Sequence, residues 1–159
     1  MATVRKPLVI PAIDPASVPE RKGVTQYPEP FRAMVAGRAR RVLGDALGLT
    51  HFGVNLTRLD PGAYSALRHW HSLEDEFIYV LEGELTLVTD DGEQTLTSGM
   101  AAGFPAGKPN AHHLHNRGTT PAVYLEVGDR RPGDEVTYPD ADLAMRWSRA
   151  FTHKDGTRY

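Results

Sequence analysis

The chain has 159 residues, of which 40% are hydrophobic, and a formal net charge of −2 at pH 7. These values suit one globular domain and lack the basic excess typical of nucleic-acid-binding proteins, so we expect no nucleic-acid partner. Cysteine is absent, which excludes disulfide bonds, thiolate metal ligands and cysteine nucleophiles.

Residues 1–46 are predicted to form an extended arm, because six prolines in this segment favour extended chain with short turns. Residues 31–47 could form one short helix, although two glycines weaken that prediction. We interpret the run Arg38-Ala39-Arg40-Arg41 as a solvated or dimer-facing patch rather than a DNA contact. The beginning of the chain lacks the apolar run of a secretory signal, and no stretch reaches the ~18 apolar residues of a membrane span. We therefore expect a cytoplasmic protein without a membrane partner.

The pattern changes to that of β-strands in residues 47–128. Phe52, Val54 and Leu56 alternate with less apolar residues, and Asp60-Pro61-Gly62 marks a turn. Further strands are expected over residues 64–71, 76–82, 85–89, 93–97, 111–116 and 122–127. Many short strands at regular spacing predict an all-β sandwich or barrel, and the absence of an internal repeat predicts a single one.

Both faces of the strand expected over residues 76–82 are apolar. Strand alternation places Glu76, Ile78 and Val80 inside the barrel and Phe77, Tyr79 and Leu81 outside. An apolar outer face must be covered by the ends of the chain or by a second subunit. We therefore expect a homodimer.

Residues 129–159 are predicted to form a tail. Residues 140–147 could form two helical turns with Asp140 as the N-cap, and Trp147, Phe151 and Tyr159 are aromatic residues that we expect to be packed. In this interpretation the arm and the tail pack on the outer face of the barrel and help to form the dimer. An unstructured C-terminus is the alternative.

The motif His69-Trp70-His71 is the most informative feature for function. On a strand, the two histidines point to the same side, with Cα atoms ~6.6 Å apart, so that both imidazoles can reach one metal ion. Glu76 follows after four residues and supplies a third, harder ligand. A chance His-x-His pair on a polar strand is the alternative.

A second histidine cluster, His112-His113-Leu114-His115, strengthens the metal hypothesis. Five of the seven histidines lie between residues 69 and 115, and packing gives no reason for such a concentration. By strand alternation, His112 shares a face with Leu114 and Asn116, whereas His113 and His115 share the opposite face.

The two segments resemble the two conserved motifs of the cupin superfamily. The first motif reads Gly62-(six residues)-His69-Trp70-His71-(four)-Glu76-(six)-Gly83. The second reads Gly99-(five)-Pro105-Ala106-Gly107-(four)-His112-(three)-Asn116, with two residues more than the family pattern between Gly107 and His112.

This resemblance implies a single-domain cupin, a double-stranded β-helix or jelly-roll barrel, over residues 47–128. It implies a ligand set of His69, His71, Glu76 and His112, in which the spacing to Asn116 favours His112, and His115 is the alternative. Such a set of nitrogen and oxygen donors suits one divalent transition metal, namely iron, manganese, nickel, cobalt or zinc.

Cupins include isomerases, lyases, decarboxylases, dioxygenases and non-catalytic binders, so the fold alone does not assign the function. Small members that resemble this chain are often described as sugar-phosphate isomerases. We expect a metal-dependent enzyme acting on a small oxygen-rich metabolite, with a metal-loaded binding or sensor cupin as the alternative. Glu126 is a weak candidate for a catalytic base, if its side chain faces inward. For an anionic ligand, Lys108 and Arg117 are better placed than Arg68, although ordinary solvated surface charge is the preferred interpretation of both.

Overall fold

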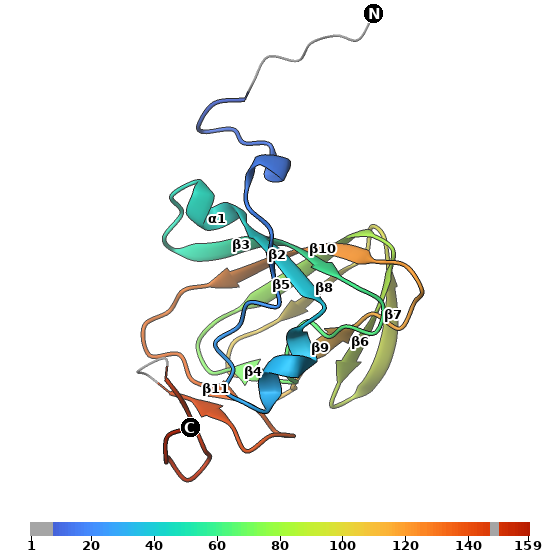
Figure 1. Ribbon diagram of the computed structural model, residues 1–159. Helices are drawn as coiled ribbons and strands as arrows, with labels where there is room; N and C mark the ends of the chain where they lie inside the picture. The colour runs from blue at the N-terminus through green and yellow to red at the C-terminus, as the bar shows by residue number, and fades with distance from the viewer. Residues whose placement is uncertain (1–7, 147–149) are drawn as a thin grey trace, which may run out of the picture.

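The computed structural model describes residues 8–146 and 150–159, and their regular structure is mostly β-strand (Figure 1). The largest unit is an antiparallel sheet in the strand order β1-β2-β3-β10-β5-β8. Its strands are β1 (Arg21–Lys22), β2 (Arg38–Val42), β3 (Phe52–Leu59), β5 (Glu76–Glu82), β8 (Ala101–Phe104) and β10 (Ala122–Asp129). The strands expected over residues 76–82 and 122–127 and the alternation from Phe52 to Leu56 are confirmed, whereas β1, β2 and β8 were not predicted.

A second, three-stranded sheet closes the barrel and has the order β7-β6-β9. Its strands are β6 (Glu84–Thr89), β7 (Gly92–Thr97) and β9 (His113–His115). One buried cluster joins the two sheets and contains Leu59, Ile78, Val80, Leu85, Leu87, Leu96, Leu114 and Tyr124. This arrangement places the hydrophobic core between the sheets, as a jelly-roll barrel requires.

The expected arm is part of the barrel over much of its length. In residues 31–47 the structure has a short 3-10 helix, η2 (Phe31–Val35), then β2, then a one-turn helix, α1 (Leu43–Ala46), in place of one helix. Strand β2 pairs with β3, and its alternating residues Arg38 and Arg40 face inward. Before β1, a 3-10 turn, η1 (Pro15–Ser17), lies in otherwise extended chain.

The helical turns expected over residues 140–147 are not present in the described part of the tail. The tail instead forms β11 (Val136–Thr137), β12 (Ala144–Met145) and β13 (Phe151–Thr152), which join β4 (Trp70–His71) in the order β13-β12-β11-β4. The side chain of Asp140 binds Arg68 and does not cap a helix. Trp147 lies outside the described residues. Sheet pairing with β4 therefore determines the conformation of the tail.

The tail and the segment before β2 pack at one end of the barrel and not on its outer face. Tyr27, Val35, Leu67, Val136, Tyr138 and Leu143 form a second buried cluster there, with Phe151 packed against it. The outward side chains of β5 are exposed in the described structure, at 43% for Phe77, 39% for Tyr79 and 41% for Leu81. The predicted inward and outward faces of β5 are thus confirmed, and the outer face is not covered by the described ends of the chain.

No helix in the described residues is long and apolar enough to cross a membrane.

Candidate metal centre

The barrel holds the two histidine segments side by side. His69 and His112 are bridge partners: the His112 N–H donates to the His69 carbonyl at 2.9 Å, and the His69 N–H donates to the His112 carbonyl at 3.2 Å. His71 follows in β4, and Glu76 begins β5. The chain between residues 71 and 76 turns, so that Glu76 comes back to face the histidines.

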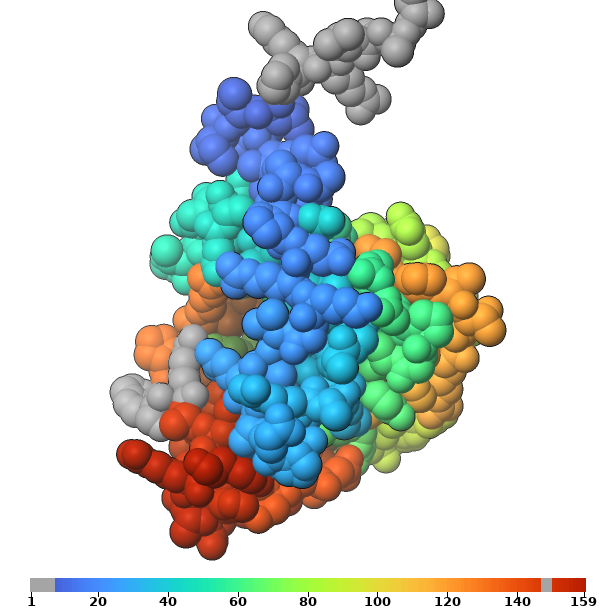
Figure 2. Space-filling model, in the orientation of Figure 1, coloured from blue at the N-terminus to red at the C-terminus, as the bar shows by residue number. Residues whose placement is uncertain are grey.

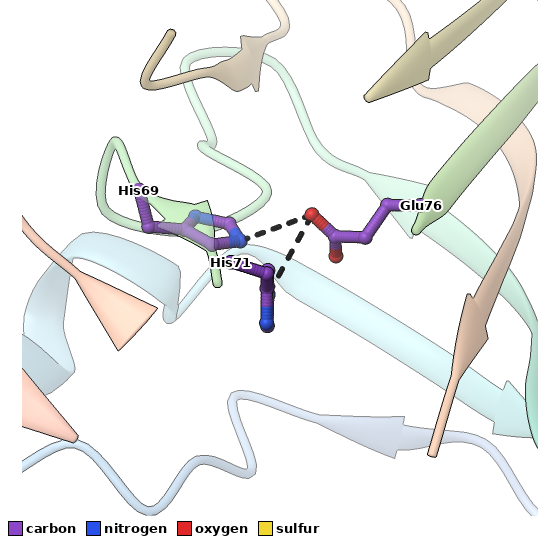
Figure 3. Close-up of side chains that lie close together, drawn as sticks. All are labelled: His69, His71 and Glu76. Carbon is purple, nitrogen blue, oxygen red and sulfur yellow. Dashed lines mark ion pairs between the residues drawn. The ribbon is translucent and has the colours of Figure 1, made fainter. Parts of the chain in front are cut away.

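Three imidazole nitrogens converge on one oxygen atom. Glu76 Oε2 lies 2.9 Å from His112 Nε2, 3.4 Å from His69 Nε2 and 3.6 Å from His71 Nε2. Figure 3 shows His69 and His71 directed toward the Glu76 carboxylate. The structure therefore brings together all four residues of the predicted ligand set.

Hydrogen bonds at the far side of two rings fix their orientation. His69 Nδ1 lies 2.7 Å from the carbonyl oxygen of Leu67, and His71 Nδ1 lies 2.6 Å from Asp134 Oδ2. A carbonyl and a carboxylate can only accept, so each Nδ1 carries a hydrogen, which leaves the Nε2 of a neutral ring available to bind a metal ion.

The His112 ring is held by stacking. It lies against the Phe104 ring, with centroids 3.5 Å apart and planes inclined by 3°. Burial lowers the pKa of His112, which favours the neutral form that a metal ligand requires.

Glu76 is ionised in this environment. Burial alone would raise the pKa of Glu76, but contacts with His112 and His69 hold that pKa well below its usual range. Burial disfavours the charged form of His69 as well, yet the contact with Glu76 raises the pKa of His69. A positive charge at the centre of this cluster is therefore stabilised, and a divalent cation would supply it in place of a proton.

The residues fit a first-row divalent metal. Ligand atoms of His69, His71 and Glu76 all lie within 4.8 Å of one another, and Glu76 Oε2 is buried without a well-formed hydrogen bond in the described structure. Three neutral imidazoles and one carboxylate are donors of the type such ions prefer. A second group, His71, Glu74 and Asp134, is equally close, but its His71 Nδ1–H is directed at Asp134, which makes Asp134 an orienting residue.

The other two histidines of the second cluster lie away from this centre. His113 Nδ1 is 3.1 Å from the Ala66 carbonyl oxygen, and burial lowers the pKa of His113 to about 4. His115 stacks on Tyr64 with centroids 3.9 Å apart, and its Nδ1 accepts a hydrogen bond from Arg117. The geometry thus favours His112 over His115 as the fourth ligand.

The cluster lies on the wall of a cavity of about 410 Å³. Figure 2 shows a hollow between the blue N-terminal segment, the orange strand region and the red tail. Its wall includes His69, Glu76 and His112 from the barrel, Gln26 and Tyr27 from the N-terminal segment, and Tyr138, Met145 and Phe151 from the tail. A small molecule can therefore reach the histidine cluster.

The Glu126 side chain faces this cavity, so it points inward, as a role as catalytic base requires. On β10 it is the partner of Ile78 on one side and of Asn55 on the other. Glu126 Oε1 accepts a hydrogen bond from the Asn55 amide at 2.9 Å and lies 2.7 Å from Arg40 Nε. Glu76 of β5 is paired with Gly128 of β10, and Glu126 lies two residues before Gly128. Glu76 and Glu126 are therefore diagonal neighbours on adjacent strands, and the Cα atoms of such neighbours are about 7–8 Å apart.

The prediction of a solvated patch at Arg38-Ala39-Arg40-Arg41 is wrong for two of its three arginines. Arg38 is only 4% exposed, and both Arg38 and Arg40 line the cavity. Only Arg41 points outward, where it lies 3.8 Å from Glu20. The run lies on a strand of the barrel, so alternation sends its basic residues to opposite faces.

The other basic residues considered from the sequence have acidic partners. Arg68 faces away from the cluster and pairs with Asp90 at 2.6 Å and Asp140 at 2.7 Å. Arg117 pairs with Glu93 at 2.6 Å. Lys108 lines a small neighbouring cavity beside His71. Charge alone in the sequence thus did not indicate which basic side chains enter the main cavity.

A family model and a solved structure of a relative reveal the family. Residues 55–128 match the sequence model of the cupin domain family. A crystal structure of a sugar phosphate isomerase from a cupin superfamily, from Silicibacter pomeroyi, has a TM-score of 0.88 and 46% sequence identity. That match covers 94% of this chain and 96% of the other. This chain belongs to the cupin superfamily.

Further relatives of this cupin extend the comparison. A crystal structure from Acidithiobacillus ferrooxidans, named provisionally as a sugar phosphate isomerase, has a TM-score of 0.69 and 33% identity over 77% of this chain and 80% of the other. The tetracenomycin polyketide synthase protein TcmJ of Streptomyces glaucescens is 28% identical over 98 residues, 61% of this chain. The match to TcmJ spans 64% of the length of that relative.

Proposed function

We propose that this cupin is a metal-dependent enzyme that acts on a small oxygen-rich metabolite: a sugar, a sugar phosphate or an organic acid. The observation that carries the proposal is the convergence of three imidazole nitrogens on Glu76 Oε2 at the wall of an accessible cavity. A structural metal site is usually closed, whereas a catalytic one adjoins space for water or substrate.

His69, His71, Glu76 and His112 would hold one iron, manganese, nickel, cobalt or zinc ion. When bound, such an ion supplies Lewis-acid chemistry that polarises a carbonyl or hydroxyl oxygen of the substrate. The chain's own part in this site is to present three neutral imidazoles and an ionised carboxylate. Leu67 and Asp134 keep the rings of His69 and His71 in the required orientation.

Glu126 is the proposed proton-transfer residue. Apart from Glu76, it is the only carboxylate among the described residues that line the cavity. Asn55 and Arg40 fix its position, and the Tyr124 hydroxyl donates to its second oxygen at 3.3 Å. A carboxylate held this close to a polarised substrate can take a proton from a carbon or a hydroxyl and return it.

The family comparison supports the substrate class. The structural relative with 46% identity is named a sugar phosphate isomerase, and isomerisation of an aldose to a ketose needs both a polarised oxygen and a proton-transfer group. The cavity of about 410 Å³ falls in the usual range for binding sites of small molecules.

The test begins with the metal content of protein purified without chelator, measured by ICP-MS for the wild type, His71→Ala and the control His51→Ala. His51 is exposed and distant in sequence from both motifs. The wild type and His51→Ala are expected to retain about one equivalent of metal, and His71→Ala to lose it.

Activity is then followed by NMR in D₂O with a panel of neutral sugars, aldose phosphates, ketose phosphates, hydroxy acids and keto acids. The wild type should convert or deuterate at least one compound, His71→Ala none, and Glu126→Gln should retain metal but lose turnover. Turnover by metal-free His71→Ala would contradict the proposal. Thermal stabilisation by a panel compound without any product over hours would favour the non-catalytic binding cupin.

A further inference from the structure

Two arginines enter the same cavity from β2. Arg38 and Arg40 are two residues apart on this strand and therefore share the inner face, and both line the cavity with Glu76 and His112. Arg40 lies opposite Thr57 of β3, and Arg38 lies opposite Leu59. The segment before β2 covers them, since Val24, Thr25 and Gln26 belong to the same wall.

Arg38 is a buried cation without an anionic partner. Its guanidinium donates hydrogen bonds to two backbone carbonyls, of Ser65 and, at 3.2 Å, of Val24. No carboxylate in residues 8–146 and 150–159 forms an ion pair with it, and only 4% of Arg38 is exposed. A guanidinium has five N–H donors, and carbonyl oxygens offset only part of the cost of burying its charge.

Arg40 shares the wall with a carboxylate. Its Nε lies 2.7 Å from Glu126 Oε1, which makes an ion pair. The same Glu126 oxygen also accepts a hydrogen bond from Asn55 at 2.9 Å, so it is shared between two partners. A guanidinium has further N–H donors besides Nε, and in a cavity wall these can bind a ligand oxygen.

The charges on the cavity wall leave room for an anion. Among the described lining residues, Arg38 and Arg40 are positive and Glu76 and Glu126 are negative, so with neutral histidines the sum is zero. A divalent metal on the histidine cluster would leave two positive charges in excess. A phosphate monoester or a dicarboxylate carries the charge that balances this excess, and a guanidinium binds either group in a bidentate manner.

We propose that Arg38 and Arg40 form a subsite for the phosphate or carboxylate group of the substrate, and that the substrate is therefore an organic anion. The inference rests on the proposed function, because it places the reacting oxygen atoms of that anion at the metal end of the same cavity. Thr25 and Gln26 line the same cavity and add polar side chains to its wall.

Direct binding of simple anions tests this subsite without requiring turnover. Isothermal titration calorimetry at low salt would use inorganic phosphate, succinate and the neutral polyol erythritol, with metal-loaded wild type, Arg38→Gln and Arg40→Gln. Arg41→Gln is the matched control, because Arg41 lies on the same strand but points outward to Glu20. Thermal unfolding and metal content confirm that each variant is folded and loaded with metal. If Arg38→Gln does not fold, anion binding by Arg40→Gln alone tests the subsite.

We expect the wild type and Arg41→Gln to bind at least one anion, and the two inward variants to bind it at least tenfold more weakly. Binding of phosphate alone indicates a phosphate monoester as substrate, and binding of succinate alone indicates a carboxylate. The subsite is ruled out if the wild type binds neither anion, or if both inward variants bind as the wild type does.

The calorimetry and the NMR assay together distinguish a failure of the subsite proposal from a failure of the proposed enzymatic function. Arginine-dependent anion binding without conversion of any compound in the NMR panel would contradict the proposed enzyme and support the subsite. Conversion of neutral sugars, together with unchanged anion binding in the inward variants, would contradict the subsite and support the enzyme.

Discussion

His71 Nδ1 lies 2.6 Å from Asp134 Oδ2, so a carboxylate of the C-terminal tail orients a candidate metal ligand of the barrel. Asp134 Oδ1 also accepts a hydrogen bond from the Leu73 backbone N–H at 2.9 Å, which fixes the turn between His71 and Glu76. One tail residue therefore holds both the ring of His71 and the chain that brings Glu76 back to it.

Asp134→Ala is expected to weaken metal binding by roughly 10–100-fold, the usual effect of removing a residue that orients a ligand histidine. Competition with a fluorescent chelator measures the affinity. Glu135→Gln is the matched control, because Glu135 is the next residue, carries the same charge and is exposed. Equal metal affinity in Asp134→Ala and Glu135→Gln would show that the contact with His71 has no role in metal binding.

His112→Ala is expected to reduce metal affinity by more than the roughly 10–100-fold that loss of an orienting residue costs. His112 Nε2 lies 2.9 Å from Glu76 Oε2, whereas the His115 ring stacks on Tyr64. His115→Ala should therefore leave the metal content measured by ICP-MS unchanged. Loss of metal in His115→Ala with retention in His112→Ala would reverse the assignment of the fourth ligand.

Arg68 joins the tail to the barrel, and its effect on stability should depend on pH. The hydrogen bond from Arg68 lowers the pKa of Asp140, and a backbone hydrogen bond from Ala111 together with Arg68 lowers the pKa of Asp90. A carboxyl group with a lowered pKa in the folded state stabilises it above the unfolded pKa of about 3.9. This stabilisation is lost as the pH falls through the folded-state value.

Arg68→Met is accordingly expected to lower the free energy of unfolding at pH 7 by on the order of 1 kcal/mol, a small value because both carboxylates are largely exposed. The difference from the wild type should begin to shrink below about pH 4, where the carboxyl groups of the unfolded state take up protons, and disappear once the pH has fallen through their lower folded-state pKa values. Urea unfolding at pH 7 and pH 3.5 measures it. Arg131→Met, which removes an exposed pair with Asp129, should have little effect at either pH. A constant deficit for Arg68→Met would mean that lost packing, and not charge, is responsible.

The strands of the barrel could be predicted where apolar residues alternate or a turn motif stands between them. Strand β5 shows this well, since Ile78 and Val80 are buried and Phe77 and Tyr79 are exposed. Strand β8 (Ala101–Phe104) was missed because its alanines and glycine have low β-propensity, and pairing with β5 determines it. Two helical turns were predicted over residues 140–147 because local capping preferences do not include the free edge that β4 offers to β11.

The grouping of the candidate ligands His69, His71, Glu76 and His112 could be predicted from spacing, because strand alternation and the cupin motifs both relate positions that are close in sequence. Asp134 could not, because it is 63 residues from His71, and only the pairing of β11 with β4 brings them together. The inward arginines were misinterpreted for a related reason. Arg38 and Arg40 form part of a strand, but the strand has no apolar alternation by which the sequence would reveal its inner face.

The outer face of β5 provides the final prediction, a homodimer that buries Phe77, Tyr79 and Leu81. These side chains are 39–43% exposed, and burial of a leucine contributes about 1.5–3 kcal/mol. Leu81→Arg should therefore weaken self-association by roughly tenfold or more. Sedimentation equilibrium measures the dissociation constant, with Leu73→Arg as the control, since Leu73 is 49% exposed but lies in the turn after β4. A wild type that is monomeric at all accessible concentrations, or equal association of both variants, would show that this face is not the dimer interface.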